Sequence, residues 1–461
     1  MDCLTGIRLD RITQIKVNPT VRKPGEITRL PSQNSDRFSL FMLPGPTQSR
    51  RILAVSYGGG HVLMLIPVLK YLQSVGYDVQ VVGLTTAAAA LRNAGFSPLG
   101  FKDILRSDED RARNHGARLA GEMHQSGKVN SLEESIAYLG LSYADLEDQL
   151  GEEGARKAFQ QQGRQAFLPR GPMRRFFDAL QPDVVLTTNS PRAELASIQV
   201  AAERGIPSVG VLDLFGLGSH NDIPADFVCV PFQQAADNLV RRGIRPEALR
   251  VTGNPNFDWV HQFSEDTSQA TDWRKAHGIG SEDLLALFAM KPVWDEKEEL
   301  IVSSLERVLP DKPELKIALR PHPNGDTRMA DNVIARLGSA AFVDDQTALP
   351  VAIDSCDALI THKSTVAVEA ALLGRQVALF HTDRDYSTHA IPLSLYDWSS
   401  LSITVEEGVE TLKAMQKETR QAQEERGKQI REAWNCDGNC PQRIAEVVIQ
   451  AIESGAHQSA A

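Results

Sequence analysis

The chain has few cysteines, no long apolar run and no excess of positive charge, and each absence excludes a class of protein. Five cysteines are scattered over 461 residues, which fits a reducing compartment and provides no disulfide framework. No stretch of about 18 apolar residues occurs, so we expect no transmembrane helix. The amino terminus lacks the basic and apolar blocks of a signal peptide. These observations predict a cytoplasmic protein and leave peripheral association with a membrane open.

The balance of charge and the cysteine spacing exclude two further classes. A net charge of −10 argues against a broad basic surface for nucleic acid. The best local basic patch contains Lys157, Arg164, Arg170, Arg174 and Arg175. A solvated helix face is the simpler explanation of this patch. Cys436 and Cys440 are too few for a structural zinc site, and no histidine pair follows them at suitable spacing. We therefore expect neither a nucleic-acid partner nor a metal.

What the chain does contain is a glycine-rich turn between an apolar strand and an apolar helix. Residues Arg51–Val55 predict a buried strand and Val62–Leu72 a helix, with three glycines and His61 between them. Glycines such as Gly59 and Gly60 let a ligand approach the backbone closely. The helix start suits a phosphate or another oxyanion. At that position His61 could remove a proton from a hydroxyl, because histidine exchanges its proton near neutral pH.

Short apolar strands alternate with helices in two parts of the chain, which predicts parallel sheets covered on both faces. We expect two tandem Rossmann-like, doubly wound α/β domains that face a central cleft. The predicted divisions are an N-terminal extension (1–48), a first domain (49–265), a second domain (266–440) and a C-terminal helix and tail (441–461). The first domain would carry a helical insertion at 103–180. Ligands of such sheets bind at the carboxyl ends of the strands, so the cleft is the expected site.

In the second domain, two predicted strands are followed by polar groups suited to a nucleotide. Lys291 comes directly after one strand; it could approach a diphosphate, and a plain surface lysine fits equally well. Arg320 and His322 belong to an Arg-Pro-His-Pro turn, whose prolines fix the backbone around the histidine. A histidine held in this way suits the orientation of a nucleotide, and a purely structural turn is the alternative.

A third polar group, Lys363, Ser364 and Thr365, precedes a mostly apolar helix that carries Glu369. The two hydroxyls can cap the helix or contact phosphate oxygens, and the lysine adds positive charge. The Glu369 carboxylate can accept both hydroxyl protons of a ribose. The alternative is a glutamate whose head group reaches solvent, as is ordinary on an amphipathic helix.

Together these motifs resemble the GT-B-fold glycosyltransferases and the related non-hydrolysing UDP-N-acetylglucosamine 2-epimerases, over residues 50–455. Gly58–His61 is similar to the glycine-rich turn of the peptidoglycan N-acetylglucosaminyltransferase. Gly253–Asp258 is similar to the Gly-Asn turn of the epimerases and of the Kdo transferases. Glu369–Gly374 resembles the ribose-binding helix of the nucleotide-sugar half. Arg320–Pro323 resembles the His-Pro turn of the epimerases and of capsule or teichoic-acid transferases.

The resemblance implies a metal-independent glycosyltransferase that moves a sugar from a nucleotide-sugar donor to a hydroxyl acceptor in polysaccharide or glycoconjugate biosynthesis. No cofactor beyond the donor is implied. His61 would be the catalytic base. The implied donor-binding residues are Gly59, Gly60, Lys291, Arg320, His322, Lys363, Ser364, Thr365 and Glu369. An inverting single displacement is the simplest outcome with one base.

Three alternatives stay open. The first is an isomerase like the UDP-N-acetylglucosamine 2-epimerases, although the chain lacks their Gly-Thr-Arg-Pro-Glu turn. The second is a surface-polysaccharide transferase that uses a CDP-alcohol or a CMP-sugar, although the Asp-Tyr-Ser-Ser segment of the teichoic-acid polymerases is absent. The third is a nucleotide-sugar-binding protein without turnover. The donor base therefore stays open between uridine and cytidine.

Overall fold

The computed structural model describes residues 50–459, apart from 59, 124–130, 217–222, 264–267, 323–324, 326–327 and 385–396. The predicted N-terminal extension, Gly59 and part of the turn after His322 lie outside the described residues. Among the helices of the described part, none is both long enough and apolar enough to cross a membrane.

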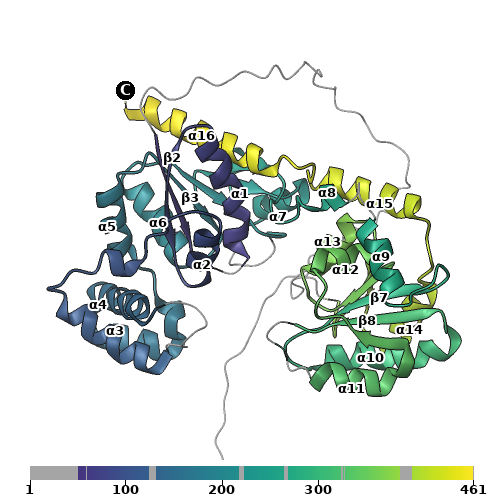
Figure 1. The fold of residues 1–461 in the computed structure, drawn as a ribbon. Coiled ribbons are helices and arrows are strands. Elements are labelled where there is room, and N and C mark those ends of the chain that lie inside the picture. The colour runs from purple at the N-terminus through teal and green to yellow at the C-terminus, as the bar shows by residue number, and fades with distance from the viewer. Residues whose placement is uncertain are drawn as a thin grey trace, which may run out of the picture. The chain divides into compact units, whose positions relative to one another are not determined.

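The described residues form two parallel sheets of six strands each. Figure 1 shows strands of both sheets with helices around them. The strand orders are β2-β1-β3-β4-β5-β6 and β12-β11-β10-β7-β8-β9. The first sheet consists of β1 (Arg51–Ser56), β2 (Asp78–Gly83), β3 (Val184–Thr188), β4 (Ser208–Val211), β5 (Phe227–Val230) and β6 (Leu249–Val251). The second consists of β7 (Leu284–Ala289), β8 (Leu315–Arg320), β9 (Ala341–Val343), β10 (Ala358–Thr361), β11 (Gln376–Phe380) and β12 (Ser400–Ser402). The predicted pair of doubly wound α/β units is confirmed.

Helices separate the strands along the chain. The first half contains α1 (His61–Ser74), α2 (Thr86–Asn93), α3 (Asp110–Met123), α4 (Leu132–Gln162), α5 (Arg170–Leu180), α6 (Ala193–Glu203) and α7 (Gln233–Arg241). The second half contains α8 (Val260–Phe263), α9 (Ser268–Ala276), α10 (Glu296–Val308), α11 (Arg328–Leu337), α12 (Leu349–Ser355), α13 (Val366–Leu372), α14 (Val405–Ala414), α15 (Arg420–Ala433) and α16 (Cys440–Ser459).

The first sheet is buried on both faces because β1 is apolar at successive positions. Ile52 and Ala54 join a core with α1, α2 and α16, whereas Leu53 and Val55 join a core with α3 to α6. The last helix, α16, contacts α1 and strands β3, β4 and β5, and Figure 1 shows it beside α1. The carboxyl-terminal helix therefore completes the core of the sheet that comes first in the sequence.

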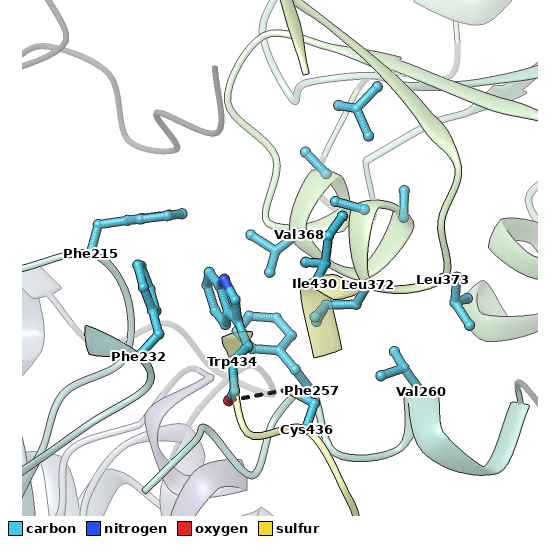
Figure 2. Packing of buried hydrophobic residues seen from close by; sticks show 14 of the residues in the cluster. Phe215, Phe232, Phe257, Val260, Val368, Leu372, Leu373, Ile430, Trp434 and Cys436 are labelled. Carbon is cyan, nitrogen blue, oxygen red and sulfur yellow. Dashed lines mark hydrogen bonds between the residues drawn. The ribbon is translucent and has the colours of Figure 1, made fainter. Parts of the chain in front are cut away.

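Trp434, between α15 and α16, lies at the centre of an aromatic cluster (Figure 2). Its ring stacks on Phe232 at a centroid distance of 4.3 Å and meets Phe215 and Phe257 edge-on at 5.6 and 5.7 Å. Residues of α13 such as Leu372 belong to the same buried cluster. The cluster therefore joins the ends of first-sheet strands to α13, the helix that carries Glu369, the residue predicted to bind ribose.

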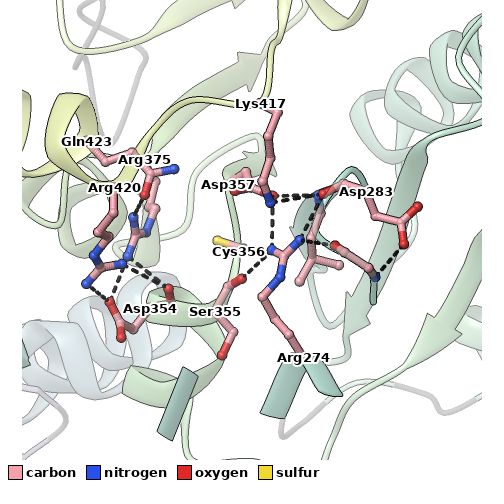
Figure 3. Close-up of polar contacts among 12 residues, drawn as sticks. Arg274, Asp283, Asp354, Ser355, Cys356, Asp357, Arg375, Lys417, Arg420 and Gln423 are labelled. Atoms are coloured by element: carbon pink, nitrogen blue, oxygen red, sulfur yellow. Dashed lines mark hydrogen bonds and ion pairs between the residues drawn. The ribbon is translucent and has the colours of Figure 1, made fainter. Parts of the chain in front are cut away.

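A buried ion-pair network fixes the chain just after the carboxyl-terminal end of α13 (Figure 3). Arg375, which follows α13, has a fully buried side chain, and its Nη2 donates to Asp354 Oδ1 at 2.7 Å. Arg420 of α15 donates to the same oxygen at 2.6 Å. Because a buried charge needs a close partner, these contacts fix α15 against α12 and α13, and with them the backbone that positions Glu369.

Candidate functional site

Each sheet has one point at which the direction of winding reverses. In the first sheet, β1 pairs with β2 on one side and with β3 on the other. In the second sheet, β7 pairs with β8 on one side and with β10 on the other. Open α/β sheets bind ligands outside the carboxyl ends of the strands at such reversals. The segments after β1, β3, β7 and β10 are therefore the candidate site.

The turn after β1 depends on glycine at one position. Gly58 has φ of +147°, and a Cβ there would lie 2.5 Å from Thr86 Oγ1, so a larger residue is excluded. The amide of the preceding residue, Tyr57, donates to Glu194 Oε1 at 2.6 Å. The glycine-rich segment is thus held tightly against α2 and α6.

His61 is the first residue of α1, and its Nε2 lies 3.9 Å from Asp213 Oδ2. Each of the two side chains is about 30% exposed, whereas His61 Nδ1 is buried, so Nε2 is the nitrogen that a substrate can approach. Asp213 follows β4 and is itself fixed. Its Oδ1 accepts from Asn189 Nδ2 at 3.0 Å, and its carbonyl oxygen accepts from the Asn254 side chain. The arrangement places a fixed carboxylate beside an accessible imidazole.

Glu194 on α6 is a candidate that the sequence analysis missed. It is fully buried, and burial raises its pKa to about 7. Its carboxyl group holds Tyr57, whose ring lies 4.2 Å below the guanidinium of Arg192. The available signal was an acidic residue in an otherwise apolar stretch, the same pattern that had singled out Glu369.

In the second sheet, the predicted residues Lys291 and Lys363 come together. Ala289 pairs in register with Arg320, and Thr361 Oγ1 donates to Ala289 O at 2.9 Å, so β7, β8 and β10 end side by side. Lys291 Nζ donates to the carbonyl of Lys363 at 2.9 Å. Burial and the charge of Lys363 lower the pKa of Lys291. Two cationic side chains therefore gather at the reversal, where an anion would relieve their repulsion.

Arg320 is the last residue of the neighbouring strand, β8, and His322 lies in the segment that follows it. Arg320 Nη1 donates to the carbonyl of Asp344 at 3.0 Å and lies 3.7 Å from that residue's carboxylate. The arginine thus holds the end of β9, a contact that the sequence did not predict. His322 is half-buried, and its carbonyl accepts from the amide of Gly325 at 2.7 Å, which closes the turn.

The residues predicted to bind phosphate and ribose lie just before α13 and within it. Thr365 is the residue before the helix and makes no side-chain cap, and Ser364 beside it is half-buried. Glu369 Oε1 accepts from the indole nitrogen of Trp259 at 3.3 Å. Burial raises the pKa of Glu369 to about 7. Its carboxyl group therefore does not simply extend into solvent, which was the alternative.

Three further titratable side chains, Asp295, Glu298 and His362, gather beside Lys291 and were not predicted as a site. Burial lowers the pKa of His362 to about 3. Burial and the Asp295 carboxylate raise the pKa of Glu298 to about 8. His362 belongs to a motif in which Lys363, Ser364 and Thr365 were the predicted site residues. Asp295 and Glu298 belong to an acidic segment that is typical of the start of a helix.

Comparison with known proteins supports the fold. No family model and no curated protein sequence matches the chain. The fold is similar to that of UDP-GlcNAc 2-epimerase from Neisseria meningitidis bound to UDP-GlcNAc, with a TM-score of 0.57 and 14% identity over 87% of this chain and 100% of that one. It is also similar to MurG from Acinetobacter baumannii, with a TM-score of 0.54 and 14% identity over 87% and 99% of the two chains. S. aureus MnaA with UDP matches with a TM-score of 0.52 and 16% identity over 86% and 94%. The chain therefore has the two-sheet GT-B fold, as its motifs implied.

Proposed function

We propose that this protein is a glycosyltransferase that moves a sugar from a nucleotide-sugar donor to a hydroxyl acceptor. The pair of His61 and Asp213 at the reversal of the first sheet is the main support. Their atoms are 3.9 Å apart, which is too long for a hydrogen bond and short enough for the carboxylate to stabilise an imidazolium. An acceptor hydroxyl at Nε2 would lose its proton to His61 as its oxygen attacks the sugar.

The donor would bind at the reversal of the second sheet. Lys291 and Lys363 supply the positive charge that a departing diphosphate needs, and electrostatic stabilisation of a leaving group is a large catalytic effect. Ser364 and Thr365 would contact phosphate oxygens through hydroxyls in the short segment between β10 and α13. Glu369, in its ionised form, would accept the hydroxyl protons of the ribose. Arg320 and His322 are assigned to the same donor site, with Arg320 acting through the end of β9.

The second candidate is a sugar-nucleotide isomerase, and the resemblance in fold to solved UDP-GlcNAc 2-epimerases favours it. The two functions differ in whether the sugar leaves the nucleotide. An epimerase returns an intact nucleotide sugar with one inverted carbon, whereas a transferase releases the nucleoside diphosphate or monophosphate.

Product analysis separates the two candidates. A thermal-shift screen of UDP, CMP, CDP, GDP and dTDP would first identify the nucleotide, because a ligand of the folded state raises the melting temperature. The matching nucleotide sugar is then incubated with the protein and followed by NMR, with UDP-N-acetylglucosamine as the uridine case. Without an acceptor we expect slow release of nucleotide and free sugar. With the correct acceptor, nucleotide release should be faster and the sugar should be bound to the acceptor. Formation of the manno epimer without nucleotide release would establish the isomerase instead.

A further inference from the structure

Asp295, Glu298 and His362 bring three metal-ligating groups to one point. His362 Nδ1 lies 3.3 Å from Glu298 Oε1 and 4.0 Å from Asp295 Oδ1. One ligand atom from each of the three residues lies within 4.8 Å of the others. Two ligands of one zinc-sized ion, at about 2.1 Å from it, are separated by at most about 4.2 Å. A small closing movement would therefore give a common coordination sphere.

The fold, rather than a flexible loop, brings these groups together. His362 directly follows β10, while Asp295 caps α10 through its bond from the Lys297 amide at 2.7 Å. Glu298 lies in the first turn of the same helix. The cluster consequently spans the reversal between β7 and β10, and its three residues come from two separate segments of the chain.

Several buried polar atoms of the cluster lack a hydrogen-bond partner within the part of the chain that the structure describes, although the Glu298 side chain bonds to Asp295 and His362 Nδ1 lies near Glu298 Oε1. Both ring nitrogens of His362, whose side chain is 1% exposed, have no hydrogen-bond partner among the described residues. Glu298 Oε2, equally buried, also lacks one in that part of the chain. Buried polar groups are almost always satisfied, because leaving them bare costs free energy. Asp295 is the solvent-accessible member, with 37% of its side chain exposed, and provides a route for an ion to enter.

We propose that Asp295, Glu298 and His362 bind one divalent first-row transition-metal cation. Two carboxylates would neutralise its charge, and the imidazole would supply a nitrogen donor. An oxygen and nitrogen set without thiolate suits Mn²⁺, Co²⁺ or Zn²⁺. The bound ion would tie the segment after β10 to the start of α10 and so fix the carbonyl of Lys363 that Lys291 holds. The expectation of no metal rested on the cysteine spacing and on the metal-independent family that the chain resembles. The present inference does not rest on the proposed function.

The direct test is titration of the chelator-treated full chain with Co²⁺, followed by visible absorption and calorimetry, and repeated with Mn²⁺ and Zn²⁺. We expect one equivalent of Co²⁺ to produce d–d bands and to raise the melting temperature. His362→Gln and Glu298→Gln should each weaken binding by roughly tenfold or more, since each removes a ligand.

Glu299→Gln is the matched control, because Glu299 belongs to the same helix but pairs with Arg336 on the surface. It should bind Co²⁺ within about twofold of the wild type. Circular dichroism and melting of each variant show that it is folded. If none of the three cations binds to the folded wild type, the proposal is wrong. The Asp295 and Glu298 carboxyl groups would then only share a proton. Equal Co²⁺ affinity in all three variants would overturn the proposal as well, since the ion would bind elsewhere.

Discussion

His61 Nε2 lies 3.9 Å from Asp213 Oδ2, and the two residues come from opposite sides of the reversal in the first sheet. Asn189 and Asn254 fix the aspartate by bonds to its carboxylate and its carbonyl oxygen. The histidine is thus paired with a carboxylate whose position the fold determines, and under the proposed function that carboxylate would stabilise the protonated form of His61.

Replacement of His61 by alanine should therefore reduce turnover strongly. We expect a loss of roughly 100-fold or more in nucleotide release for His61→Ala, and a smaller loss for Asp213→Asn, which retains the shape but not the charge. Calorimetry should give unchanged donor affinity in both variants, because the donor is assigned to the other sheet. Turnover near the wild-type rate in His61→Ala would remove this residue from the mechanism.

The pKa of Glu369 predicts a pH dependence of donor binding. Burial raises this pKa to about 7, so the carboxylate that accepts ribose hydroxyl protons forms as pH rises through neutrality. Affinity for an intact nucleotide sugar should increase from about pH 6 to about pH 8 in the wild type. In Glu369→Gln it should be weaker at the higher pH and nearly independent of pH. The intact sugar is the right probe because its diphosphate does not titrate in this range. Parallel profiles for the two proteins would contradict the ribose assignment.

Glu194 predicts a pH dependence of stability. Its pKa is about 7 in the folded chain against a usual value of 4.5, so the folded state binds the extra proton between these values. The contribution of Glu194 to the free energy of unfolding consequently falls by about 3 kcal/mol as the pH rises from about 4.5 to about 7. The free energy of unfolding of Glu194→Gln should not show this decrease. Relative to the wild type, the variant should therefore be more stable above neutral pH than at low pH. Urea unfolding across the pH range measures the difference.

The control for that series is Glu203→Gln, an exposed glutamate of the same helix that pairs with Arg174. Its pH profile should follow that of the wild type. A constant difference in unfolding free energy between Glu194→Gln and the wild type at all pH values would show that Glu194 does not hold a proton in the folded state.

The buried network at α13 predicts a large effect on stability. Asp354, with 2% of its side chain exposed, is shared by Arg375 and Arg420. Asp354→Asn leaves a fully buried guanidinium without its carboxylate, so unfolding free energy should fall by about 3 kcal/mol. Asp311→Asn removes an exposed partner of Lys413 and should cost less than about 1 kcal/mol. Equal losses in the two variants would contradict the role assigned to the network.

The sequence predicted the sheets more completely than the site. Buried parallel strands such as Leu284–Ala289 are continuous apolar runs, so their positions followed from composition. The short strand Ala341–Val343 and the helix Leu349–Ser355 were missed, because three to seven residues give too little periodic signal. The packing of α16 on the first sheet depends on contacts that no local pattern encodes.

Candidate site residues could be proposed from the sequence where they form local motifs, but not where they come from separate segments. Lys291 and Lys363 each follow a strand, and the sheet register brings them together. Asp213, the partner of His61, was recognised only as part of a loop, because the two residues are 152 positions apart in the sequence and come together only in the fold. Glu298 was missed for the same reason, because nothing in an acidic helix start indicates that one of its residues faces a buried histidine.

Calorimetry of the preferred nucleotide with Lys291→Met tests whether a nucleotide binds at the reversal of the second sheet. The matched control is Lys413→Met, an exposed lysine elsewhere in the same half of the chain. We expect Lys291→Met to weaken nucleotide binding by roughly tenfold or more and Lys413→Met to leave it within about twofold of the wild type. Undiminished affinity in folded Lys291→Met would contradict nucleotide binding at this reversal.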